Sequence, residues 1–177
     1  MALVILLAPV VGEIAGEYFE KVSLPQFPDT VTHTIRGDGK QVNSARITVV
    51  VDGFTFTGTI TGSKLQFTTD GGSTWKDGAS DYEEASYDRS NNVLAASVDG
   101  MIIMSNNTPD SFNFELLGMG LLVPTMMRAA DMTISATDCR SIHGYRRVAE
   151  VNNGFRIIFS GTAVNITGGT MYLAYWG

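Results

Sequence analysis

The sequence is poor in the residues that usually form covalent links, hold metal ions or catalyse reactions. It contains one cysteine, Cys139, so no disulfide can form within the chain. Its two histidines are His33 and His143. The alternating residues around His33 favour a strand, and residues 141–144 resemble a turn, so neither histidine is expected to activate Cys139 as a nucleophile. We therefore expect no catalytic residue, no metal site and no cofactor.

Positive charge and long apolar runs are also scarce. The chain carries 12 lysines and arginines against 18 aspartates and glutamates, a formal net charge of −6. Such a field repels phosphate groups, so neither nucleic acid nor an anionic membrane surface is an expected partner. The first eleven residues are almost wholly apolar, but no basic residue precedes them, Pro9 interrupts them and Glu13 follows them. This run is too short for a membrane span and untypical of a signal peptide.

The N-terminal segment is instead interpreted as an arm that packs on its own body, on a neighbouring subunit or on lipid. The spacing of Ile14, Tyr18 and Phe19 predicts a short amphipathic helix over residues 12–22. Pro25 and Pro28 then end any helix. We expect residues 1–24 to form the apolar arm and helix, and residues 25–177 to form one β-rich body.

Beyond the prolines, apolar and polar residues alternate with the period of a strand, and turn pairs such as Asp38-Gly39, Asp52-Gly53 and Asp99-Gly100 separate the segments. The fold class is therefore predicted to be mainly β, with a β-sandwich or barrel-like body. Strands are predicted over residues 30–36, 42–51, 65–69, 93–97, 101–105, 155–160, 162–166 and 171–176. The apolar segment 114–127 contains two glycines and a proline, which suits either an irregular buried crossing or a subunit contact.

One local motif is Thr68-Thr69-Asp70-Gly71-Gly72-Ser73-Thr74-Trp75. It resembles the Asp-box of sialidases and other β-propellers, which is a structural hairpin without a catalytic role. The resemblance implies a structural turn formed by Asp70, Gly72 and Trp75. A looser echo ends at Phe112, but two such units are too few to close a propeller. A pair of stacked hairpins within a sandwich is favoured over a propeller fragment completed by oligomerisation.

The C-terminal third carries Gly154-Phe155, then Ser160-Gly161-Thr162-Ala163-Val164-Asn165, then Met171-Tyr172-Leu173-Ala174-Tyr175-Trp176. This order resembles the closing strands of phage tail-fibre and other virion proteins. The resemblance implies a structural ending and supplies no binding residues. Both faces of the strand 171–176 are apolar, so we expect the core to cover one face and a neighbouring subunit to cover the other.

The acidic side chains of residues 77–88 could provide a glycosidase acid/base pair or bind calcium. No Asp-x-Asp-x-Asp-Gly loop is present, and a solvated acidic loop is favoured. The residues in question are Asp77, Asp81, Glu83, Glu84 and Asp88.

Together these features predict a virion structural protein and not an enzyme: a capsid decoration or cement protein, a fibre or a tail component. Its expected partners are copies of itself and other virion proteins, with a glycan of the host surface as a further candidate. The residues predicted at the assembly interface are Leu3, Val4, Ile5, Leu6, Leu7, Tyr18, Phe19, Tyr175 and Trp176. The alternative is a carbohydrate-binding module on a cell surface, with Trp75, Tyr82 and Tyr87 as its stacking platform.

Overall fold

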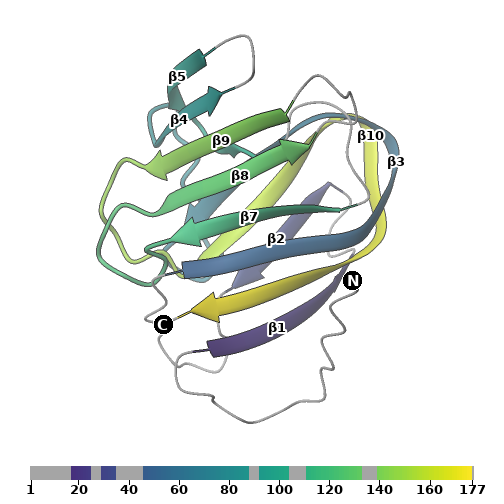
Figure 1. The fold of residues 1–177 in the computed structure, drawn as a ribbon, viewed down its shortest axis with the longest axis horizontal. Coiled ribbons are helices and arrows are strands. Elements are labelled where there is room, and N and C mark those ends of the chain that lie inside the picture. Colours follow the sequence, from purple (N-terminus) through teal and green to yellow (C-terminus); the bar gives the residue numbers. More distant parts are fainter. Residues whose placement is uncertain are drawn as a thin grey trace.

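The computed structural model in Figure 1 describes residues 17–24, 29–34, 46–87, 92–103, 111–132 and 139–176. These residues form ten strands and contain no helix. The strands are β1 (Glu17–Leu24), β2 (Thr30–Thr34), β3 (Arg46–Thr68), β4 (Tyr82–Tyr87), β5 (Asn92–Val98), β6 (Met101–Ile102), β7 (Phe112–Leu117), β8 (Met126–Met132), β9 (Cys139–Arg146) and β10 (Gly154–Trp176).

All ten strands belong to one antiparallel sheet. Its main order is β1-β10-β3-β7-β8-β9-β4-β5, while β2 also pairs with β10 and β6 also pairs with β3. The prediction of a mainly β fold is therefore confirmed. Adjacent strands in this order are often far apart in the sequence, so the sheet is held together by long-range pairing.

The two longest strands of the sheet, β3 and β10, have 23 residues each and pair with each other. They pair from Gly154 opposite Thr68 to Trp176 opposite Arg46, with shifts of register in the middle. Residues 154–158 of β10 also pair with β2, and residues 169–176 also pair with β1. In β3, residues 46–51 also pair with β7, and Lys64 and Leu65 also pair with β6. Figure 1 shows both strands curving together around one side of the molecule. The sheet consequently turns back on itself.

Glycines permit this bend because the two backbones come too close for a side chain. A Cβ on Gly58, where φ is +85°, would lie 2.3 Å from the carbonyl oxygen of Ala163. A Cβ on Gly161 would lie 1.8 Å from the carbonyl oxygen of Thr59. Bulges that add residues to one strand of a pair bend it and increase its twist. The predicted turn at Asp52-Gly53 is wrong, since the chain continues through it along β3.

The core lies on the concave face of this bent sheet. Leu173, Val49, Phe114, Ala129 and Ile142 stand side by side on five neighbouring strands, and all five are buried. The ring of Phe114 meets the ring of Phe155 edge to face with centroids 5.9 Å apart, although these two residues lie on different sides of the bend. Burial of such side chains is the main favourable contribution to folding.

The helix predicted over residues 12–22 is wrong where the structure describes it, because Glu17–Leu24 is the strand β1. Pairing with β10 along all eight residues outweighs the local helical spacing. This segment, expected to belong to the arm, is therefore part of the sheet. Residues 1–16 lie outside the described part of the chain.

Two further segments differ from expectation. A solvated acidic loop was predicted over residues 77–88, but Tyr82–Tyr87 is the strand β4. Residues 141–144 were expected to form a turn, but they lie within the strand β9, which pairs with β4. The C-terminal residues predicted as three strands form the single strand β10, because Gly161 and Gly169 bend the chain without reversing it. Met171, Leu173 and Tyr175 do face the core, as predicted for this strand.

Candidate functional site

The turn between β3 and β4 is organised around the carboxylate of Asp70. The hydroxyl of Thr68 and the backbone N–H of Thr74 donate to its Oδ1, over 2.7 and 2.9 Å, and the hydroxyl of Thr74 donates to its Oδ2 over 2.6 Å. These hydrogen bonds, led by that of Thr68, hold the pKa of Asp70 well below its ordinary value. Gly71 and Gly72 have φ of +71° and +96°, which favours glycine at both positions.

Trp75 closes this turn and is partly covered. The guanidinium group of Arg156 lies over its ring, 4.7 Å from the centroid, which is cation–π geometry. Arg156 Nε also donates to Gln66 over 2.8 Å. The backbone N–H of Asn153 donates to the carbonyl of Thr68 over 2.9 Å and fastens the turn to the chain before β10. The structural role of Asp70, Gly72 and Trp75 stays a prediction, which this geometry suits.

Tyr82 cannot serve in the predicted sugar platform because its side chain is in the core. Its hydroxyl oxygen accepts the N–H of Phe67 and donates to the carbonyl of Lys76, both over 2.8 Å. Burial raises the pKa of this phenol well above its ordinary value. The side chain of Tyr87 lies outside the described part of the structure. Tyr82 was a candidate only for the alternative function, since an aromatic residue in a polar segment suits either a core or a binding surface.

The acidic residues of this region point in different directions. Glu84 is buried, whereas Glu83, next to it in β4, faces outward and accepts a hydrogen bond from the hydroxyl of Tyr145. Asp81 accepts from Arg146 over 3.0 Å, and Asp77 lies 3.7 Å from Arg156. Within the described ranges, no group of three or more metal-ligating residues is close enough to hold an ion. The predicted candidate Asp88 lies outside those ranges.

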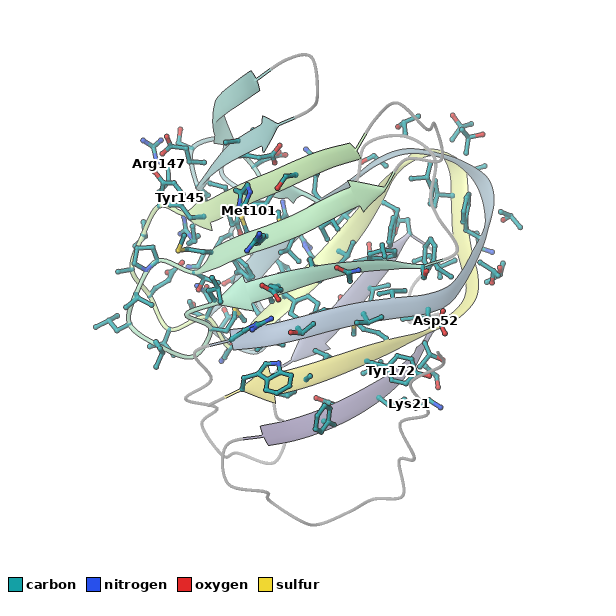
Figure 2. All side chains as sticks on the ribbon, in the orientation of Figure 1. Lys21, Asp52, Met101, Tyr145, Arg147 and Tyr172 are labelled. Atoms are coloured by element: carbon teal, nitrogen blue, oxygen red, sulfur yellow. The ribbon has the colours of Figure 1, made fainter. Side chains whose placement is uncertain are left out.

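Exposed aromatic residues gather where β1 meets β10. Phe19 is 40% exposed and Trp176 is 37% exposed, and their rings meet edge to face with centroids 6.3 Å apart. Figure 2 shows the labelled side chains of Lys21 and Tyr172, which come from the same two strands, next to each other. The Nε1–H of Trp176 donates to the hydroxyl of Thr48 over 3.2 Å. We call Phe19 and Trp176 the aromatic edge.

A second group of exposed apolar side chains lies on the neighbouring loops 118–125 and 147–153 and at the start of β8. We call it the apolar loop surface, and Leu122, its most exposed member, is 72% exposed. The loops are joined by a bridge between Val123 and Glu150 and by a hydrogen bond from Gly120 N–H to the carbonyl of Asn152. The members of the surface are Leu122, Val123, Met126, Val148 and Val151.

Buried polar groups fix these loops from below. Arg146 is 4% exposed, and its Nε donates to Glu150 over 2.7 Å while its Nη1 donates to Asp81. The side-chain amide of Asn152 donates to Thr125 over 2.9 Å, and both residues are fully buried. Hydrogen bonds and ion pairs of this kind hold the loop backbone in one conformation. The exposed apolar groups are therefore presented by an ordered framework.

The structure brings together only part of the predicted assembly interface. Phe19 and Trp176 lie side by side at the surface, but Tyr175 is buried and its hydroxyl donates to Glu20 over 3.0 Å. The side chain of Tyr18 and the residues from Leu3 to Leu7 lie outside the described part of the chain. For Leu122, Val123 and Met126, a subunit contact was one of two alternatives predicted for residues 114–127, whereas Val148 and Val151 were not predicted at a contact. The sequence feature that indicated this contact was a run of apolar residues interrupted by glycine and proline.

No protein-family model matches the sequence, and a search of curated proteins finds no match. In the portion of the chain that the structure covers, no helix is long and apolar enough to cross a membrane.

Proposed function

We propose that this chain is a structural subunit of a virion, as a capsid decoration or cement protein, a fibre or a tail component, and that it acts by adhesion without catalysis. The observation that carries the proposal is the apolar loop surface, where Leu122 is 72% exposed on loops held by buried hydrogen bonds. A cluster of apolar side chains at a protein surface typically marks a contact with another macromolecule.

The energetics favour adhesion. Apolar area removed from water contributes about 25 cal/mol per Å², and fixed loops lose little conformational freedom when they are covered. The side chains of Leu122 and Val148 are both at least half exposed, so a partner gains most of their hydrophobic contribution. The aromatic edge offers a second contact. Two contacts on one body would allow copies to join each other and other virion proteins.

We also propose that the bent sheet is a β-sandwich. Phe54 in the first half of β3 stacks on Phe159 in the first half of β10, with centroids 4.9 Å apart. A Cβ on Gly144 in β9 would lie 2.6 Å from the sulfur of Met101 in β6, so these strands also approach closely. Two such faces with interdigitated side chains are the usual core of a sandwich.

The assignment to a virion rests on the sequence of β10 and its surroundings. Gly154-Phe155 and the segments 160–165 and 171–176 resemble the closing strands of phage tail-fibre and other virion proteins, and here all of them belong to the strand β10. A fibre or decoration protein with this body would display its remaining surface to solvent or to a host glycan.

The test is the native mass of the full-length chain, followed by electron microscopy of any particle it forms. Replacing Leu122 and Val148 together by aspartate should lower the associated mass, because charged groups in an apolar contact lose their hydration. The matched control is Thr162→Asp, an exposed position at the bend of β10. A double variant that stays folded by circular dichroism and associates like the unsubstituted chain would count against this surface.

A further inference from the structure

The strand β1 lies at one end of the main strand order. It pairs with β10 on one side, and no other strand described by the structure pairs with its second side. Figure 1 shows β1 at the rim of the sheet. A rim of this kind presents backbone N–H and C=O groups that can pair with another strand.

The outer face of β1 combines an aromatic and a charged residue. Phe19 lies beside Trp176, and Lys21, which is exposed, places its Nζ 5.9 Å from the ring centroid of Tyr172. Figure 2 shows Lys21 and Tyr172 next to each other at this rim. Because successive strand residues alternate between faces, positions 17, 19 and 21 form one row.

We propose that β1 pairs antiparallel with β1 of a second copy, around a two-fold axis that passes through Phe19. Phe19 then faces Phe19 of the second copy, and Lys21 faces Glu17 twice, once on each side of the axis. The result is a row of four aromatic rings flanked by two pairs of opposite charge. Directly opposed aromatic and oppositely charged pairs both stabilise antiparallel strands.

Other registers fit less well. A shift of the pairing by one residue would place outward residues of one copy opposite inward residues of the other. An axis through Glu20 sets two glutamates against each other, and an axis through Lys21 sets two lysines against each other. Charge complementarity thus selects Phe19, and the self-complementary contact closes as a dimer.

This inference rests on the proposed adhesive function and names one partner, a second copy, together with the pairing that joins the two. It predicts how charge reversal acts. Glu17→Lys or Lys21→Glu alone sets like charges opposite each other twice, and each should weaken dimerisation about tenfold. A mixture of the two variants should associate like the unsubstituted chain, because both opposed pairs are again of opposite sign.

The experiment is analytical ultracentrifugation of the full-length protein over a range of concentrations, with circular dichroism to check folding. The matched control is Arg128→Glu, which makes the same change of charge at an exposed position of β8. Arg128→Glu should leave dimerisation unchanged. Single variants that dimerise normally, or a mixture that is not restored, would overturn the proposed pairing.

A second measurement tests the position of the axis. Directly opposite residues in antiparallel strands have Cα atoms about 4.5–5.5 Å apart, within reach of a disulfide. In a Cys139→Ser background, Phe19→Cys should therefore cross-link two copies under mild oxidation. Lys21→Cys should not, because its counterpart lies four residues, about 13 Å, further along the strand. Equal cross-linking of the two variants would overturn the register.

The outcomes separate this inference from the proposed function. If the chain associates but charge reversal at β1 has no effect while Leu122 and Val148 matter, only the β1 pairing falls. If the full-length chain is a monomer at every concentration, both the pairing and adhesion between copies fall.

Discussion

Replacing Tyr82 by phenylalanine removes one oxygen atom from the core and leaves the ring in place. In the native protein this oxygen accepts the N–H of Phe67 and its proton is donated to the carbonyl of Lys76, each over 2.8 Å. Phenylalanine can do neither. The N–H of Phe67, on a fully buried residue, would be left without this partner, which costs about 1–3 kcal/mol.

The same substitution should alter the dependence of stability on pH. Burial raises the pKa of Tyr82 in the folded protein above the ordinary tyrosine value of about 10. Above that pH the unfolded chain loses the phenolic proton while the folded chain retains it, so stability falls as pH rises. The variant lacks this proton. Its deficit relative to the unsubstituted protein should therefore shrink by up to about 1.4 kcal/mol per pH unit above pH 10.

The assay is urea denaturation at pH 7 and at several values between pH 9 and pH 11. At pH 7 each kcal/mol lost should also lower the Tm by about 2–4 °C. The control is Tyr172→Phe, a partly exposed tyrosine on the outer face, which should change stability by less than about 0.5 kcal/mol. If Tyr82→Phe is as stable as the unsubstituted protein, or if its deficit does not change with pH, the hydrogen-bonding role of Tyr82 is refuted.

Two further predictions concern the turn and the bend. Asp70→Asn should make stability depend less on pH below about pH 4. The pKa of Asp70 is lowered in the folded state, so its carboxylate stabilises the protein above the ordinary pKa of about 4. This stabilisation is lost as pH falls from that value through the pKa of the folded state. Thermal melts from pH 7 to pH 2 check this, and equal slopes for both proteins would contradict it. Gly58→Ala should destabilise the protein more than Gly53→Ala, since both positions have positive φ but only a Cβ at Gly58 meets backbone, at 2.3 Å. Gly53→Ala should lower the free energy of unfolding by about 1–2 kcal/mol, because alanine is strained at positive φ. Denaturant midpoints that rank the two variants in the opposite order would refute the close approach of β3 and β10.

The sequence was sufficient to predict the strand content because alternation with a period of two is a local signal. It was insufficient to predict strand length. Local sequence rules predict that a strand ends at Gly53 and at Gly161. Both strands nevertheless continue through these residues, because the pairing between β3 and β10 continues on both sides of them. The strand β1 was misassigned for the same reason: its pairing partner lies about 150 residues away, and nothing near Phe19 reveals it.

The candidate surfaces divide in the same way. Phe19 and Trp176 could be selected as large aromatic residues in short apolar segments, but their contact depends on the pairing of β1 with β10. Glu84 was misjudged because its charge suggests exposure to solvent, whereas it lies in β4, between β5 and β9, and is buried. The apolar loop surface depends on the bridge between Val123 and Glu150, which no local pattern predicts.

The strand β10 is synthesised after β1, β2 and β3, and this order affects how the protein folds during synthesis. Both β1 and β2 pair with β10, and β3 pairs with it along its whole length. Until residues 154–176 have emerged from the ribosome, those three strands therefore lack the strand with which they all pair. The apolar side chains of β3 are then more exposed to solvent than in the folded protein. Strand pairs this distant in sequence close slowly, and an unpaired strand in a nascent chain is prone to aggregation. Rapid synthesis of the chain through residue 176, or a chaperone that binds β3 until then, would raise the yield of folded protein.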